Sequence, residues 1–221
     1  MPSPKLPRRI LSWNAKVGRN PVTVVAALYA FIAISRPQVI VLSEATAYAP
    51  ALRRAFKLRW HVYRKGSDMV VMVRRNLPKP TVTAVGHDIA WRGPKAGLPH
   101  AGRSWLVLDW DGFRLIALHR VPGGPAGGVS PELDGVNKLA WDTEAQLLAG
   151  LLRDTISALV VGDQNARIVE LVVFMANHNL DPISTGAKVD WAMARHFRAT
   201  GRRLLRRGSD HPAVLYKRAK K

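Results

Sequence analysis

The sequence has no cysteine among its 221 residues. This absence excludes a disulfide framework, a thiolate nucleophile and a zinc ribbon. Long apolar runs are also scarce, because the most apolar stretch, Val22 to Ile34, has 13 residues and ends at Ser35-Arg36-Pro37. A membrane-spanning helix needs about 20 apolar residues, so this stretch predicts a buried helix.

A secretory signal is not evident at the start of the sequence. Ile10 and Leu11 follow the basic residues Arg8 and Arg9 but run directly into polar residues, without the apolar region that a signal requires. We therefore expect a cytoplasmic protein without integral membrane association. The composition, rich in arginine, alanine, glycine and valine, is typical of a GC-rich bacterium or its phage.

Acidic residues are few, with 15 Asp and Glu against 34 Lys and Arg, a formal net charge of +19. Residues 105–194 hold six basic and eleven acidic residues, a net charge of −5, so the remainder carries +24. The basic residues concentrate in three stretches, 5–19, 53–75 and 195–221. Such a surplus predicts attraction to a polyanion: nucleic acid, an anionic membrane surface or a phosphorylated substrate.

The apolar content of 48% is enough for a buried core, and the length suits a single domain over residues 1–221, with a basic tail from about residue 217. Short apolar strands alternate with helices, and Asp111-Gly112 gives the strongest hairpin signal. This order predicts an α/β layered sandwich with antiparallel pairing in its middle. Strands are expected at 9–14, 38–42, 59–64, 68–74, 81–86, 105–110, 113–119, 157–161, 188–194 and 212–217, and helices at 21–35, 49–57, 137–153 and 168–178.

Polar residues recur where these apolar strands end. Any one of them is also typical of a turn or a helix cap. Their repetition in one small chain with few acids indicates a site, because strand ends converge along one edge of a sheet. The residues are Asn14, Glu44, His119, Asp163, Asn165, Asp190, Asp210 and His211.

Hydrolysis of a phosphate ester requires this set of side chains. Glu44 and Asp210, assisted by Asn14, can hold a divalent metal, since Mg²⁺ prefers hard oxygen ligands. Asp163 can act on water, and Asn165 and His119 can donate to phosphate. Asp190 can fix the tautomer of His211.

In this order, Ser12-Trp13-Asn14, Leu42-Ser43-Glu44, His119, Gly162 to Asn165, Val189-Asp190 and Ser209 to His211 resemble the endonuclease/exonuclease/phosphatase superfamily, and its pancreatic deoxyribonuclease branch in particular. The resemblance implies a four-layer α/β/β/α sandwich of two mixed, mostly antiparallel sheets with helices outside. It also implies Mg²⁺ or Mn²⁺ near Glu44 and in-line attack by water, with Asp163 and His211 as alternative general bases. Ser43 departs from the family, which usually has Gln there.

The charge pattern favours a metal-dependent nuclease that acts on nucleic acid, DNA more than RNA, as a monomer. Two alternatives stay open: a phosphatase or phosphodiesterase for a small phosphorylated molecule or lipid headgroup, and an inactive nucleic-acid-binding relative. Basic residues close in sequence to the site are expected to meet the phosphates that flank the scissile bond. These are Arg53, Arg54, Arg59, Arg103, Arg202, Arg203, Arg206 and Arg207.

Overall fold

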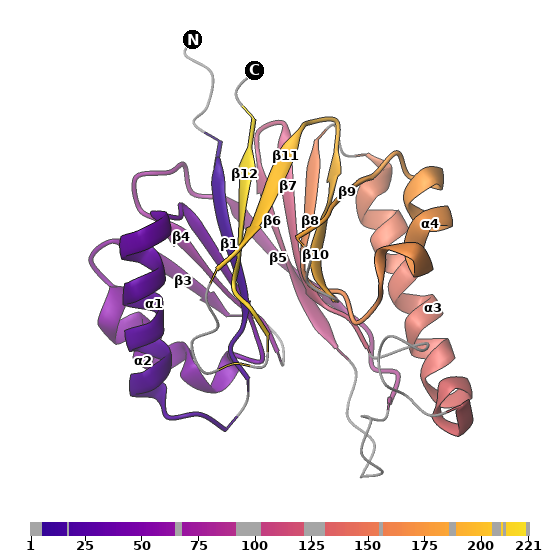
Figure 1. Cartoon of the computed structure of the whole chain (residues 1–221), viewed down its shortest axis with the longest axis horizontal. Helices are drawn as coiled ribbons and strands as arrows, with labels where there is room; N and C mark the ends of the chain where they lie inside the picture. The colour runs from indigo at the N-terminus through magenta and orange to yellow at the C-terminus, as the bar shows by residue number, and fades with distance from the viewer. Residues whose placement is uncertain are drawn as a thin grey trace.

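In the computed structural model, two six-stranded sheets face each other between helices, the α/β/β/α arrangement expected from the sequence (Figure 1). The structure describes residues 6–16, 18–64, 68–91, 103–121, 131–154, 157–185, 189–204, 209 and 211–219, and the backbone only of 131–136, 169 and 170. Asp210, Arg206 and Arg207 therefore lie outside the described residues. None of the described helices is long and apolar enough to span a membrane.

The first sheet has the strand order β11-β12-β1-β2-β4-β3. β1 and β2 are parallel, and the other neighbours pair antiparallel. Its strands are β1 (Arg9–Asn14), β2 (Val39–Ser43), β3 (Trp60–Arg64), β4 (Val70–Arg74), β11 (Ala199–Arg203) and β12 (Val214–Arg218).

The second sheet has the order β5-β6-β7-β8-β10-β9, and again one central pair, β7 and β8, is parallel. The hairpin at Asp111-Gly112 is confirmed, because Trp110 pairs with Phe113 and Gly112 has a φ of 70°. The strands are β5 (Thr81–Gly86), β6 (Ser104–Trp110), β7 (Phe113–His119), β8 (Ala158–Asp163), β9 (Asp181–Ile183) and β10 (Asp190–Arg195).

The helices cover the outer faces of the two sheets (Figure 1). The Asn20 side chain accepts from the Val22 N–H at 2.9 Å, and Pro21 begins α1, which is the cap that the sequence predicts. On the first sheet lie α1 (Pro21–Ser35), η1 (Thr46–Tyr48) and α2 (Ala49–Phe56), and on the second α3 (Pro131–Arg153), η3 (Ile168–Leu171) and α4 (Val172–Asn177).

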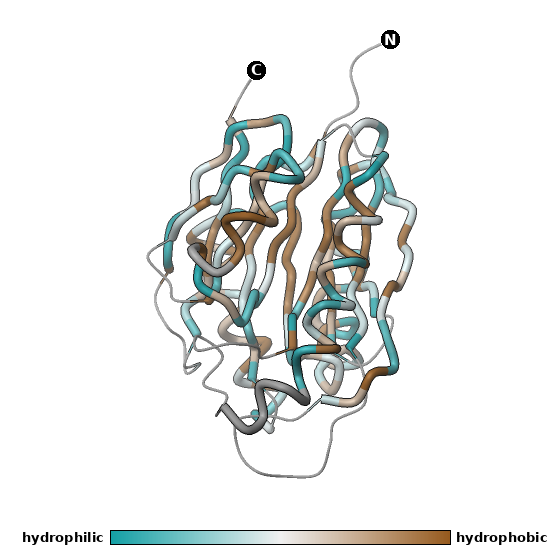
Figure 2. The backbone as a smooth tube through the Cα atoms, turned by 90° about the vertical axis from the view of Figure 1, so that its right-hand side faces the viewer, coloured by the Kyte–Doolittle hydropathy of each residue, from teal (hydrophilic) through white to brown (hydrophobic). Residues whose placement is uncertain are grey.

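The central strands are apolar on both faces, because the middle of each sheet is buried on both sides. In β1, Ile10 faces the layer between the sheets, whereas Leu11 and Trp13 face α1 and α2. In β8, Val161 faces the layer between the sheets, whereas Val160 faces α3 and α4. Figure 2 shows the hydrophobic residues along the central strands and hydrophilic ones toward the periphery.

Several expected boundaries need correction. α3 begins at Pro131, six residues before the expected start, and the helix expected at 168–178 divides into η3 and α4. β9 and β11 were not expected, because β9 has three residues with a proline and β11 lacks an apolar pattern. β12 also includes Lys217 and Arg218, so these two residues form part of a strand and not the start of a basic tail.

Candidate active site

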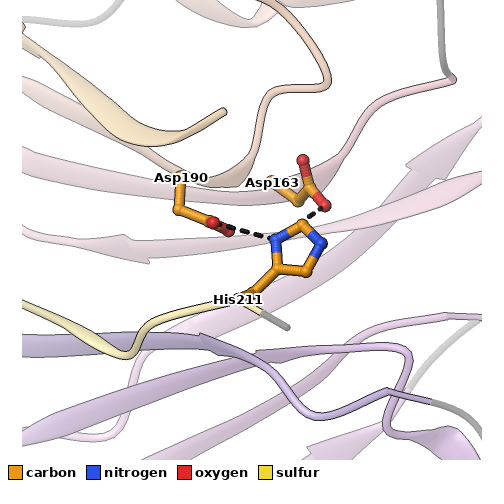
Figure 3. A group of neighbouring side chains, drawn as sticks. All are labelled: Asp163, Asp190 and His211. Atoms are coloured by element: carbon orange, nitrogen blue, oxygen red, sulfur yellow. Dashed lines mark hydrogen bonds and ion pairs between the residues drawn. The ribbon is translucent and has the colours of Figure 1, made fainter. Parts of the chain in front are cut away.

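Three neighbouring strands place functional side chains in one row across the end of the second sheet. Asp163 is the register partner of His119 on one side and of Asp190 on the other. His211, just before β12, approaches the two carboxylates from the first sheet (Figure 3). The His211 Nδ1 lies 2.8 Å from the Asp190 Oδ2 and 3.7 Å from the Asp163 Oδ2. The expected Asp–His pair is therefore present in the structure.

The geometry assigns a tautomer to His211. Because the Asp190 carboxylate accepts, the hydrogen lies on Nδ1 and Nε2 carries the lone pair. Burial raises the pKa of Asp190, and the charge of Asp163 acts in the same direction, against the hydrogen bond from His211. Ser209 fixes the approach of this segment, since its Oγ donates to the Asn14 carbonyl at 2.8 Å and accepts from the His211 N–H at 3.2 Å.

The first sheet contributes Asn14 and Glu44 at the ends of its parallel strands. Asn14 pairs with Ser43, and Glu44 follows in the left-handed backbone region at a φ of 53°. The Asn14 Nδ2 lies 3.0 Å from the Glu44 Oε1 and 3.3 Å from the Asp163 Oδ2, so this amide joins the two sheets. Left-handed conformations in non-glycine residues cost of order 1 kcal/mol and occur preferentially at functional sites.

His119 is held by two residues that the sequence does not single out for this role. Its Nδ1 lies 2.6 Å from the Asp68 Oδ2, and the Arg103 guanidinium contacts both groups. Its Nε2 faces Glu44 and Asp163, at 3.9 and 3.6 Å. Burial opposes ionisation of Asp68, but the hydrogen bonds and charges of His119 and Arg103 outweigh it and lower its pKa to about 2.

Gly162 allows β7 and β8 to approach closely at this point. Its φ is 140°, and an added Cβ would overlap the carbonyl oxygen of Leu118. The following segment turns back on the site: the Asn165 N–H donates to the Asp163 Oδ1 at 2.9 Å, and the Asn165 Nδ2 donates to the Arg120 carbonyl at 2.6 Å.

The donor atoms of the site suit a hard divalent cation. Asp163, Asp190 and His211 each offer one ligand atom within 4.8 Å of the others, a group that could hold a metal ion. The Asp190–His211 hydrogen bond would have to break for His211 Nδ1 to bind a metal, which favours oxygen ligands in this site. Glu44 is half-buried at 29% exposure, and the Asn14 side chain lies beside it, with its Nδ2 toward Glu44 and its Oδ1 accepting from the Lys16 N–H. Carboxylate and amide oxygens are the ligands that Mg²⁺ prefers.

No protein-family model and no curated protein matches the sequence. Solved structures match over nearly the whole chain. A D. rerio TDP2 complexed with single-strand DNA product has 13% identity and a TM-score of 0.65, covering 98% of this chain and 100% of that chain. An endonuclease/exonuclease/phosphatase from Bacteroides vulgatus has 12% identity and a TM-score of 0.67, covering 98% and 100%.

The chain has the endonuclease/exonuclease/phosphatase fold. The 3'-5' exonuclease NExo from Neisseria meningitidis, with 15% identity and a TM-score of 0.65, covers 95% of this chain and 99% of that chain. Nucleases and a 3' phosphatase are thus among the proteins that share this fold. The fold class that the sequence resemblance implies is confirmed.

The structure separates the basic residues into different places. Arg53 and Arg54 are exposed in the last turn of α2, and Arg202 and Arg203 are exposed on the edge strand β11. Arg59 precedes Trp60, whose register partner is Arg74 at the end of β4 remote from Glu44. The β3–β4 hairpin therefore carries Arg59 to the far end of the sheet, and the structure does not bring it to the site.

Arg103 was expected to contact phosphate, but its side chain is only 8% exposed. Its guanidinium carbon lies 4.2 Å from the centre of the Trp91 ring, and its nitrogen contacts Asp68 and His119. Arg103 thus holds Asp68 and His119 in place from inside the protein. A signal for Asp68 does exist in the sequence, since it is the one acid among the eight basic residues of stretch 53–75.

Proposed function

We propose that this chain is a divalent-metal-dependent hydrolase that cleaves phosphodiester bonds in nucleic acid. One observation carries the proposal: side chains from seven separate segments, on both sheets, converge with two Asp–His pairs and an amide bridge between the sheets. Each residue by itself could serve only in a turn or as a helix cap. Such individual roles do not explain why carboxylates and imidazoles lie together inside the protein. The segments contribute Asn14, Glu44, Asp68 with His119, Asp163 with Asn165, Asp190 and His211.

Glu44 is the residue proposed to hold the metal, with Asn14 beside it and Asp210 contributing from the segment outside the described residues. A bound Mg²⁺ or Mn²⁺ would polarise the phosphoryl oxygen and stabilise the leaving oxygen. The site suits a cation because Glu44, Asp68, Asp163 and Asp190 gather there in a chain whose net charge is +19.

His211 is the proposed general base. Asp190 accepts from its Nδ1, so Nε2 is the nitrogen that can accept a proton from water. The His211 side chain is 24% exposed and water can reach it, whereas Asp163 is 2% exposed and already accepts from the Asn165 N–H. Asp163 therefore orients the reacting groups, and the charge on the imidazolium formed is balanced by Asp163 and Asp190.

His119 and Asn165 are the proposed donors to the phosphoryl oxygens. His119 donates from Nε2, because Asp68 and Arg103 occupy Nδ1. The Asn165 Nδ2 has two hydrogens and uses one on the Arg120 carbonyl, so the other is available for phosphate. Such donors, fixed before the reaction, stabilise the charge that develops in the transition state.

Nucleic acid is the proposed substrate because the charge outside residues 105–194 is +24 and because TDP2 and NExo are seen with DNA. The deciding experiment measures hydrolysis of plasmid, single-stranded DNA, RNA, a 3'-phosphorylated oligonucleotide and inositol phosphates, in Mg²⁺ and in Mn²⁺. Cleavage of polynucleotides is expected. Turnover of small phosphoesters alone would favour a phosphatase, and no turnover of any substrate would favour an inactive nucleic-acid binder.

Chemical rescue tests the assignment of the base. H211A should lose turnover and recover part of it when imidazole is added, since imidazole can enter the space that the side chain leaves. D163N, which removes an orienting charge and no base, should lose turnover without recovery. Rescue of neither variant would contradict the role given to His211.

A further inference from the structure

Glu144 is a fully buried carboxylate on α3, whereas the other charged side chains that the structure describes on this helix, Lys138, Asp142 and Arg153, are exposed or partly exposed. It is 0% exposed, whereas the side chains of Lys138 and Asp142, six and two residues earlier on α3, are 69% and 48% exposed and paired with each other at 2.6 Å. Burying a carboxylate is costly unless it is paired and hydrogen-bonded. The partners of Glu144 therefore indicate what the buried charge does.

Two of these partners, Arg120 and Val121, lie in the segment directly after His119, and the third is His87, whose Nε2 lies 3.5 Å from the Glu144 Oε1. The Val121 N–H donates to the Glu144 Oε1 and Oε2, at 3.1 and 3.0 Å, and the Arg120 Nε donates to Oε2 at 3.4 Å. The Arg120 guanidinium lies 3.6 Å from the centre of the Trp141 ring and donates to the Trp141 carbonyl at 3.2 Å. Burial lowers the pKa of Arg120, and Glu144 opposes that effect.

The peptide that joins Arg120 to Val121 is held from both sides. Its N–H donates to Glu144, and its carbonyl accepts from the Asn165 Nδ2 at 2.6 Å. The Arg120 N–H also donates to the Asp163 carbonyl at 3.0 Å. Hydrogen bonds in a chain polarise one another, so a carboxylate on the N–H makes the carbonyl a stronger acceptor.

We propose that Glu144 is a positioning residue for the reaction, and that it fixes the Asn165 amide through the peptide between Arg120 and Val121. Glu144 does not reach the reacting atoms itself. It sets which way the Asn165 amide points: one Nδ2 hydrogen is tied to Arg120, and the other is directed into the site. This inference rests on the proposed function, in which Asn165 donates to phosphate.

The test separates the peptide contact from the buried charge. E144Q alone would leave the Arg120 charge buried without its partner, which is strongly destabilising and can prevent folding. The comparison is therefore between R120M/E144Q, which keeps an oxygen acceptor for the peptide, and R120M/E144L, which removes it. D142N on the same helix is the matched control.

Two readouts are needed, and the first is kinetic. With bis(p-nitrophenyl) phosphate and Mn²⁺, R120M/E144L should have a kcat about tenfold below that of R120M/E144Q, because a displaced donor stabilises the transition state less. When Asn165 is also replaced by Ala, R120M/E144L and R120M/E144Q should differ in kcat by less than about twofold, since Glu144 acts on the reaction through Asn165. D142N should match the wild type. An equal loss in both backgrounds would mean that Glu144 is only structural and would overturn the proposal.

The second readout is the NMR signal of the Asn165 side-chain amide, which does not depend on turnover. Its chemical shift should move and its hydrogen exchange should quicken in R120M/E144L but not in R120M/E144Q. If the wild type hydrolyses no phosphoester, the proposed function fails, and this signal still decides whether Glu144 holds Asn165. An Asn165 signal that is the same in both variants would refute the positioning role.

Discussion

Replacing Asp68 by Asn tests the electrostatic support of His119. The pKa of Asp68 is lowered from 3.8 to about 2, because His119 and Arg103 outweigh the cost of burial. One pKa unit corresponds to about 1.4 kcal/mol, so the ionised carboxylate contributes about 2 kcal/mol to the free energy of unfolding at pH 7. The Asp68 side chain is only 16% exposed, so solvent screening reduces this figure little.

The pH dependence of this contribution has a definite sign. Because the folded-state pKa lies below the unfolded one, the contribution is complete above about pH 5 and is lost as the pH falls from about 4 toward 2, reaching about half at pH 3. Urea unfolding followed by tryptophan fluorescence should show D68N to be less stable than the wild type by about 2 kcal/mol at pH 7. The difference should shrink as the pH is lowered to 3.

A surface carboxylate provides the matched control. Asp109 accepts from the Arg114 Nε at 2.6 Å, but the two side chains are 34% and 26% exposed. Exposed pairs contribute about 1 kcal/mol or less, so D109N should change stability little at either pH. A D68N difference below about 0.5 kcal/mol, or one that does not change with pH, would refute the reasoning about Asp68, His119 and Arg103.

Three further predictions concern the metal ligand, the basic edge strand and the close strand pair. E44Q should lower turnover about 100-fold or more, while its affinity for plasmid, measured by fluorescence anisotropy, stays within about threefold of the wild type. A parallel loss of affinity would contradict the assignment of catalysis to the metal site and of binding to the basic residues. R202Q/R203Q should reduce the slope of log K for DNA against log salt by about 1 to 2, whereas R59Q, at the far end of the sheet, should leave it unchanged. G162A should lower the free energy of unfolding by about 3 kcal/mol or more, measured by thermal or urea unfolding, because the backbone at this position is strained for alanine and the added methyl overlaps the neighbouring strand. A variant with wild-type stability would contradict this packing of β7 against β8.

The sequence by itself determined most of the strands, the end of each strand that carries polar residues, and the concentration of positive charge. These features are local: Asn14, Glu44 and Asp163 each end an apolar run, and Asp111-Gly112 gives a hairpin whatever surrounds it. The order of the segments was enough to indicate the fold. The polar residues converge because the carboxyl ends of β1, β2, β7 and β8 lie at the same end of the two sheets.

Only the tertiary structure decided which side chains meet. Asp68 and His119 are 51 residues apart, and Glu144 lies 23 residues from Val121, so no local pattern couples them. Strand register also removed Arg59 from the site, although it follows Glu44 closely in sequence. The physical reason is that propensity and periodicity act over a few residues, whereas the pairing of charges is set by sheet register and by helix packing across the whole chain.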